Sequence, residues 1–173
     1  MKHRNRGNSR KEIRGGKMQF NMFLAGRIAF GPGVSSLTGE KAFALGGKRT
    51  FLVTDRTMEK LGTAEKIVSY INAAGLSVIP FYDVEPEPSV ETVDAATALA
   101  KREKCDLVVG LGGGSCLDVA KATSVLLTNE GSAARYQGLG LVKNAGVPKI
   151  MIPTTAGTGS EVTFTSVLIR KSD

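Results

Sequence analysis

Residues 106–111 form a largely apolar run that leads directly into three consecutive glycines and then into a helical pattern. A strand without polar alternation is expected where both of its faces are covered, as in a parallel sheet. Other short apolar runs alternate along the chain with helical patterns of about 10 to 15 residues. This alternation predicts βαβ units, and therefore an α/β fold in which a parallel sheet carries helices on both faces.

Apolar spacing, together with glycine and proline, places the expected elements along the chain. Strands are predicted at residues 27–30, 50–54, 76–81, 106–111 and 149–152, with a further extended segment at 162–170. Helices are predicted at residues 34–45, 58–74 and 115–128, and one more begins after Ser89, a suitable N-cap. Residues 129–146 are expected to form a looser, glycine-containing connection.

The net charge of +7 in 173 residues is concentrated in residues 1–17, which hold seven basic side chains and one acidic one. We therefore divide the chain into a basic disordered arm over residues 1–17 and one α/β domain over residues 18–173. The arm has neither aromatic side chains on which bases could stack nor the apolar run of a secretory signal. Nucleic-acid binding by the arm is a weak alternative, and we expect a cytoplasmic location and no membrane partner.

Histidine and cysteine usage limits the chemistry open to the chain. His3 is the sole histidine and lies in the basic arm, so a histidine base or a cluster of histidine metal ligands cannot be completed. The two cysteines, Cys105 and Cys116, do not make a disulfide framework in a chain of this size. We accordingly assign no catalytic and no metal-binding residue.

Three glycines, Gly112, Gly113 and Gly114, are the strongest local signal for a ligand. Glycine lets the backbone approach a phosphate closely, and the start of the following helix offers unpaired N–H groups and a positive dipole end. Their spacing differs from the usual dinucleotide fingerprint, and no Gly-Lys-Ser/Thr follows as in a Walker loop. A tight strand-to-helix turn without a ligand is the alternative interpretation.

Ser115, Asp118 and Lys121 follow the glycines in the predicted helix. Ser115 is expected to cap this helix, and Asp118 three residues later is expected to complete a capping box. Lys121 lies about one turn further and is expected to pair with Asp118. A capped helix start with an ion pair explains these residues equally well without any ligand.

Two further segments place polar groups at the ends of predicted strands, where open α/β sheets bind their ligands. The strand at 149–152 ends in a loop rich in threonine and glycine, residues 153–163, which can donate to a ribose or a phosphate. Asp55 follows the strand at 50–54, and its carboxylate can accept hydrogen bonds from an adenosine ribose and repel a 2′-phosphate. Each segment also has a plain interpretation, as turn chemistry for the loop and as a helix N-cap for Asp55.

In this order and spacing, the segments resemble the iron-containing (group III) alcohol dehydrogenase family of the dehydroquinate synthase-like superfamily. Residues 112–121 match the family pattern GGGSxxDxAK, residues 153–163 resemble PTTAGTGSEVT, and residues 30–33 are similar to the opening FGxG turn. The resemblance covers about residues 18–173. It implies the Rossmann-like, N-terminal nucleotide-binding half of such an enzyme, with the helical C-terminal domain absent from this chain.

The resemblance implies a role toward NAD for the residues that follow the predicted strands. Gly113, Gly114 and Ser115, with Gly112 beside them, would cradle the pyrophosphate. Asp55 would hold the adenine ribose and favour NAD over NADP.

For the remaining matches, the resemblance implies less direct positions. Thr154, Thr155 and Thr158 would line the cofactor site beside the nicotinamide half. Asp118 and Lys121 would lie near the phosphates, at the start of the helix.

The activity that the resemblance implies is the NAD-dependent interconversion of a primary alcohol or diol and its aldehyde. A divalent iron or zinc ion would be bound in the full-length protein, which we expect to be a homo-oligomer, whereas the isolated chain would bind NAD without completing the metal site. One departure is Glu87, because the family often has a cofactor-contacting asparagine between these two prolines. A glycerol dehydrogenase or dehydroquinate synthase-like relative is the alternative, although the loop at 153–163 is closer to the alcohol dehydrogenase pattern.

Overall fold

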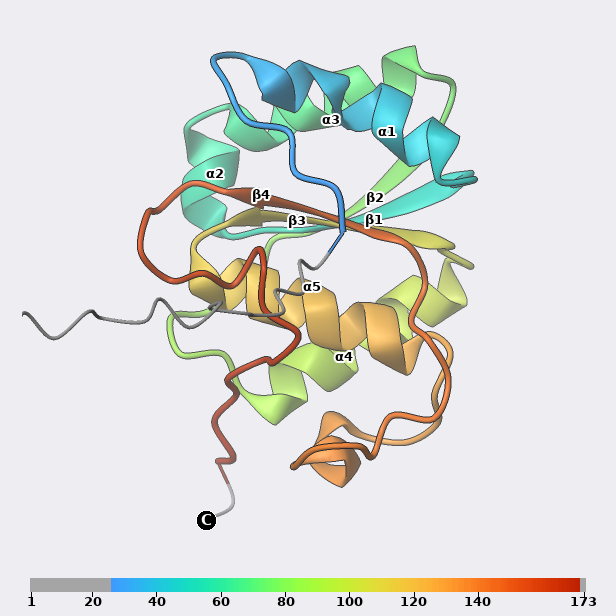
Figure 1. Cartoon of the computed structure of the whole chain (residues 1–173), viewed down its shortest axis with the longest axis vertical. Coiled ribbons are helices and arrows are strands. Elements are labelled where there is room, and N and C mark those ends of the chain that lie inside the picture. The colour runs from blue at the N-terminus through green and yellow to red at the C-terminus, as the bar shows by residue number, and fades with distance from the viewer. Residues whose placement is uncertain (1–25, 172–173) are drawn as a thin grey trace, which may run out of the picture.

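The computed structural model describes residues 26–171, whose centre is a four-stranded parallel sheet (Figure 1). Its strands are β1 (Arg49–Val53), β2 (Ser77–Phe81), β3 (Leu107–Gly112) and β4 (Lys149–Pro153), in the spatial order β2-β1-β3-β4. The register places Val53 beside Phe81 and Gly110, and Gly112 beside Pro153. The predicted α/β fold with a parallel sheet is confirmed.

Helices cover both faces of the sheet (Figure 1). One face carries η1 (Val34–Leu37), α1 (Thr38–Ala44), α2 (Arg56–Lys60) and α3 (Thr63–Ala73), and the other carries α4 (Val90–Arg102) and α5 (Gly114–Leu126). A short helix, η2 (Ala133–Tyr136), follows α5. The connection from β1 to β2 moves one way along the sheet, and the connections to β3 and β4 move the other way. Because such crossovers are right-handed, their helices fall on opposite faces.

β3, one of the two central strands, is buried along its whole length. Leu107, Val109 and Leu111 pack in the cluster formed with α1 and α3, whereas Val108 packs in the cluster formed with α4 and α5. Gly110 leaves room for α5, because a Cβ at this position would lie 2.8 Å from the Cβ of Ala120. Burial on both faces accounts for the apolar run that predicted a parallel sheet.

The helix predicted at 58–74 is divided into α2 and α3. α2 begins earlier than expected because the Asp55 side chain caps it. Gly62 then adopts a left-handed conformation, with φ +69°, and its N–H donates to the carbonyl of Glu59 at 2.9 Å. A left-handed glycine closes a helix in this way, so one helical pattern in the sequence yields two helices in the structure.

Two predicted extended segments are wrong. Residues 27–30 form no strand, and Ile28 and Phe30 are 63% and 98% exposed. Residues 162–170 are mostly irregular, with a single isolated bridge between Ile169 and Ser89. An apolar pattern becomes a strand only where a neighbour takes up its backbone hydrogen bonds along its length. In residues 162–170 this happens at Ile169 alone, whose N–H donates to the carbonyl of Pro88 at 2.9 Å and whose carbonyl accepts the N–H of Val90 at 3.0 Å.

Two further predictions concern the arm and the membrane. The arm expected at residues 1–17 lies outside the described residues. Across residues 26–171, none of the helices combines the length and apolarity that a bilayer crossing requires.

Candidate nucleotide-binding site

The order of the strands reverses between β1 and β3, which are neighbours in the sheet but not in the sequence. From β1 the chain continues into α2 on one face, and from β3 it continues into α5 on the other. Open α/β sheets bind their ligands at the carboxyl ends of the strands where this reversal occurs. Asp55 lies two residues beyond β1, and Gly113 directly follows β3, so two of the predicted segments meet there.

Asp55 is both a helix N-cap and a candidate ligand-binding carboxylate. Its Oδ1 accepts hydrogen bonds from the backbone N–H groups of Thr57 at 2.8 Å and Met58 at 2.9 Å, so the N-cap interpretation is correct. Its Oδ2 accepts a hydrogen bond from the thiol of Cys116 at 3.3 Å. The contact with Cys116 joins the end of β1 to the first turn of α5, and the sequence had not suggested it.

The glycine loop meets α5 without any side-chain cap. The N-cap is Gly113, which has no side chain to accept a hydrogen bond from the first turn, and α5 begins at Gly114. The prediction that Ser115 caps this helix is therefore wrong, because Ser115 lies inside the first turn. The first backbone N–H groups of a helix have no intrahelical partner, so this end of α5 keeps its capacity to bind an anion.

The hydroxyl-rich loop after β4 lies against the glycines. The N–H of Thr154 donates to the carbonyl of Gly112 at 2.9 Å. A Cβ added to Gly113 would lie 3.4 Å from Oγ1 of Thr155. At Gly114 it would lie 3.2 Å from Cγ2 of Thr158.

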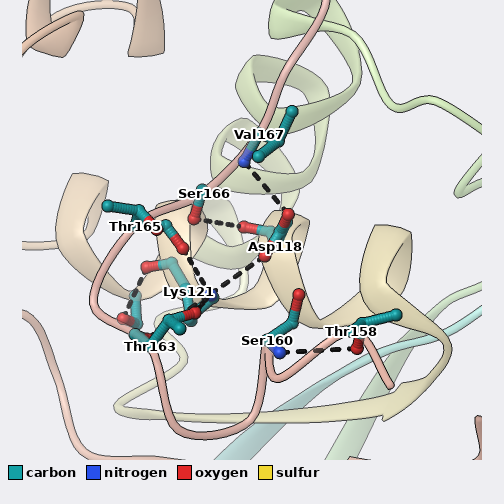
Figure 2. A network of polar contacts seen from close by, with 9 residues as sticks. Asp118, Lys121, Thr158, Ser160, Thr163, Thr165, Ser166 and Val167 are labelled. Carbon is teal, nitrogen blue, oxygen red and sulfur yellow. Dashed lines mark hydrogen bonds and ion pairs between the residues drawn. The ribbon is translucent and has the colours of Figure 1, made fainter. Parts of the chain in front are cut away.

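Ser160 belongs to the same arrangement, because its Oγ would lie 3.3 Å from a Cβ on Gly114. Its backbone N–H donates to Oγ1 of Thr158 at 3.4 Å (Figure 2). The structure thus brings the three predicted segments together and adds Ser160 and Cys116 to them. Both added residues lie inside motifs that the sequence singled out, but at positions that the motif comparison left without a role.

Asp118 and Lys121 form a buried ion pair, with Lys121 Nζ 2.9 Å from Asp118 Oδ1 (Figure 2). Their side chains are only 10% and 6% exposed. The predicted pairing is confirmed, but the capping box is wrong. The carboxylate of Asp118 is directed toward Lys121 and the N–H of Val167, which donates to Oδ2 at 3.0 Å, rather than toward the start of α5.

The same pair fastens the segment at 163–167 to α5 (Figure 2). The ammonium group of Lys121 donates to Oγ1 of Thr163 at 3.2 Å and to the carbonyls of Thr163 and Thr165. The hydroxyl of Ser166 donates to the backbone carbonyl of Asp118 at 3.0 Å. The far end of the hydroxyl-rich loop is therefore held by two side chains of the helix whose start faces the glycines.

The sequence model of iron-containing alcohol dehydrogenases matches residues 25–173. The chain belongs to this family. Among similar members is long-chain-alcohol dehydrogenase 1 of Geobacillus thermodenitrificans (strain NG80-2), 46% identical over 127 residues that cover 72% of this chain and 32% of that enzyme. The 1,3-propanediol dehydrogenase of Klebsiella pneumoniae is 40% identical over 141 residues, covering 80% of this chain and 36% of that enzyme.

Solved structures of the family share the fold of this chain. A 1,3-propanediol oxidoreductase superposes with a TM-score of 0.85 at 37% identity, covering 90% of this chain and 41% of that one. Sulfoacetaldehyde reductase from Bifidobacterium kashiwanohense, solved in complex with NAD⁺, superposes with a TM-score of 0.79 at 34% identity, covering 90% and 41%. The chain thus spans about a third to two fifths of the length of the family members that it matches.

The name of the family refers to iron, which binds to clusters of oxygen, nitrogen or sulfur ligands. Within residues 26–171, no three His, Cys, Asp or Glu side chains are grouped closely enough to hold a metal ion.

A cavity of about 710 Å³ lies on the α5 face of the sheet, apart from the glycine loop. Its walls come from the second half of α5, from η2 and its following loop, and from the segment at 163–170. Lys149 lines this cavity at the opposite end of β4 from the candidate site, and burial together with the charge of Lys121 lowers the pKa of its ammonium group. Lys121 and Thr163, the last residues of the two longer family motifs, also line this cavity, whereas the glycines and Thr154, Thr155 and Thr158 lie elsewhere, at the carboxyl ends of the strands.

Proposed function

We propose that this chain binds NAD at the carboxyl ends of β1, β3 and β4, as the nucleotide-binding half of an NAD-dependent alcohol dehydrogenase. The observation that carries the proposal is the meeting of a carboxylate, a glycine loop and a hydroxyl-rich loop where the strand order reverses. Asp55 lies beside Cys116 at 3.3 Å, and Thr154 donates to the carbonyl of Gly112 at 2.9 Å. The NAD⁺ complex of a related reductase supports the same choice of cofactor.

Each part of NAD has a chemically suitable partner in this arrangement. The adenosine ribose would donate its hydroxyls to Asp55, which would also repel the additional phosphate of NADP. The pyrophosphate would lie at the uncapped start of α5, against Gly113, Gly114 and Ser115. Thr154, Thr155 and Thr158 would lie beside the nicotinamide half. Asp118, whose carboxylate forms an ion pair with Lys121, would lie in α5 near the phosphates and support the site indirectly.

A protein with the length of these relatives would transfer hydride between an alcohol and NAD, and the ligands of the metal expected for the family would come from residues outside 26–171. We assign no single alcohol as the substrate. Relatives of comparable identity bear the names of chemically different substrates, among them choline at 42% identity and methanol at 36%. For the isolated chain we propose cofactor binding without turnover.

The test of the binding site is a calorimetric titration of the 173-residue chain with NAD and with NADP. Asp55→Asn removes the charge but keeps a good N-cap, so α2 should persist. NAD affinity should fall about ten- to hundredfold, because a hydrogen bond to a charged group is lost, and the preference over NADP should narrow.

Asp106→Asn is the matched control for this substitution. Asp106 also accepts two backbone N–H groups, from Lys48 at 2.9 Å and Arg49 at 3.0 Å, but at the opposite end of the sheet. Its replacement should leave the binding of NAD unchanged. A folded wild-type chain that takes up no NAD would overturn the proposal.

Turnover is measured separately, by NADH absorbance after adding NAD and either 1,3-propanediol or a long-chain alcohol. The isolated chain should show none, with or without added Fe²⁺. Sustained NADH formation would contradict the second part of the proposal while leaving the binding site intact.

A further inference from the structure

Cys116 lies where the two halves of the candidate site meet. Its Sγ is 3.3 Å from Oδ2 of Asp55, the carboxylate that follows β1. Cys116 itself belongs to the first turn of α5, immediately beyond the glycine loop, and is 1% exposed. The thiol therefore connects Asp55, which is expected to bind the ribose, with the glycine loop, which is expected to bind the pyrophosphate.

The contact leaves Asp55 with few open positions for a ligand. Oδ1 already accepts the N–H groups of Thr57 and Met58, at 2.8 and 2.9 Å. A carboxylate oxygen has two lone-pair positions, so Oδ1 is filled by the cap of α2. Oδ2 accepts the thiol and keeps one position. A ribose hydroxyl that binds Asp55 must therefore approach Oδ2 beside the sulfur of Cys116.

The thiol of Cys116 is chemically suited to donate a hydrogen bond to the carboxylate of Asp55. Burial, and then the negative charge of Asp55, raises the pKa of Cys116, so the group stays protonated at neutral pH. Gly112 makes the close approach possible. A Cβ on Gly112 would lie 2.7 Å from Sγ of Cys116 and 3.5 Å from Oδ2 of Asp55. The first glycine of the motif thus clears space for the thiol as well as for a turn.

We propose that Cys116 is a positioning residue for the adenosine ribose: its thiol fixes Oδ2 of Asp55 so that the remaining lone pair faces the ribose hydroxyls. In this role Cys116 acts through Asp55, whose carboxylate binds the ribose. The inference rests on the proposed function, in which Asp55 binds the ribose of NAD.

A double-mutant cycle on the full chain tests the inference, with NAD affinity measured by calorimetry. Cys116→Ala removes the donor and should weaken NAD binding about three- to tenfold, the effect of one lost hydrogen bond. In the Asp55→Asn background the same substitution should have no further effect, because Cys116 acts through Asp55. Cys116→Ser retains a donor and should restore most of the affinity.

Cys105→Ala is the matched control, because Cys105 is the other buried free cysteine and packs in the apolar cluster formed with α4 and α5. It should leave NAD affinity unchanged. Equal weakening by Cys116→Ala in both backgrounds, or no weakening in the wild-type background, would overturn the positioning role while leaving the proposed function standing. Absence of NAD binding by the folded wild-type chain would instead remove the proposed function, and this inference with it.

Discussion

The connection after β3 and the connection after β4 are held in different ways. The glycine loop after β3 is fixed by backbone groups: the N–H of Thr154 donates to the carbonyl of Gly112 at 2.9 Å, and the N–H of Leu117 donates to that of Gly113 at 3.2 Å. The segment at 163–167 is fixed by side chains, because Asp118 and Lys121 take up its backbone groups from α5. One connection is held by backbone hydrogen bonds, and the other depends on a buried pair of charges.

Because of this difference, we expect the two connections to respond differently to substitution. The partners that hold the second segment lie 42 to 49 positions earlier in the chain. Removing one of them leaves a buried charge and frees the far end of the hydroxyl-rich loop. A substitution at Gly113, whose backbone angles are extended, should leave the fold in place and change only the space that a ligand can occupy.

Breaking the buried pair should have the largest effect on stability. Lys121→Met leaves the carboxylate of Asp118 buried without its partner, which should lower the free energy of unfolding by about 3 to 5 kcal/mol. Urea unfolding followed by circular dichroism measures this loss. Combining it with Asp118→Asn should recover part of the stability, because the uncompensated charge disappears while an acceptor for Val167 remains.

The exposed pair of Lys41 and Glu40 is the control for this substitution. Its atoms approach to 2.7 Å, but its side chains are 52% and 66% exposed. Lys41→Met should therefore cost less than about 1 kcal/mol. If Lys121→Met cost no more than Lys41→Met, the segment at 163–167 would not depend on the buried pair.

Gly113→Ala should weaken NAD binding while leaving stability nearly unchanged. Gly113 has extended backbone angles, φ −75° and ψ −175°, which alanine also adopts. The new methyl group would meet Oγ1 of Thr155 at 3.4 Å, an ordinary contact, but it would occupy the surface expected to face the pyrophosphate. We expect an affinity loss of about tenfold or more, equivalent to about 1.4 kcal/mol.

Gly110→Ala should give the reverse result. Its methyl group would lie 2.8 Å from the Cβ of Ala120, so β3 and α5 would be forced apart at a cost of about 1 to 3 kcal/mol. Gly110 lies within the buried strand, so the residual folded protein should still bind NAD. Similar losses of stability in both variants would contradict the distinction between the ligand surface and the core.

The same contrast separates what the sequence predicts from what it does not. The buried strand at 106–111 and the glycine loop leave a signal in consecutive residues, so an apolar run followed by three glycines was sufficient to predict them. The helix caps were harder to predict, because the location of the first helical turn decides whether the Ser115 side chain can reach an unpaired N–H. Residues 162–170 carry a strand-like pattern, but Asp118 and Lys121 take up backbone groups that a strand would offer to a neighbour. No local pattern reports that competition, or the contact of Cys116 with Asp55.

The linker at 84–88, between β2 and α4, combines backbone conformation with side-chain contacts. The hydroxyl of Thr92 donates to Glu85 at 2.8 Å, and Ser89 caps α4 by accepting the N–H of Thr92 at 3.2 Å. Glu87 is exposed and adopts φ +55°, a left-handed conformation that asparagine accepts more readily than glutamate. This preference accords with the asparagine that the family often carries between the two prolines.

Glu87→Asn should therefore produce a small gain, of about 0.5 to 1 kcal/mol in the free energy of unfolding. Lys104→Asn is the matched control, because Lys104 is also exposed and also adopts φ +55°, beyond the end of α4. Urea unfolding should show a similar gain for both variants. Only Glu87→Asn should also improve NAD affinity, by about threefold, because an amide replaces a carboxylate beside the expected cofactor. An equal effect of both substitutions on NAD affinity would place Glu87 outside the cofactor site and leave its left-handed backbone as the sole reason for asparagine there.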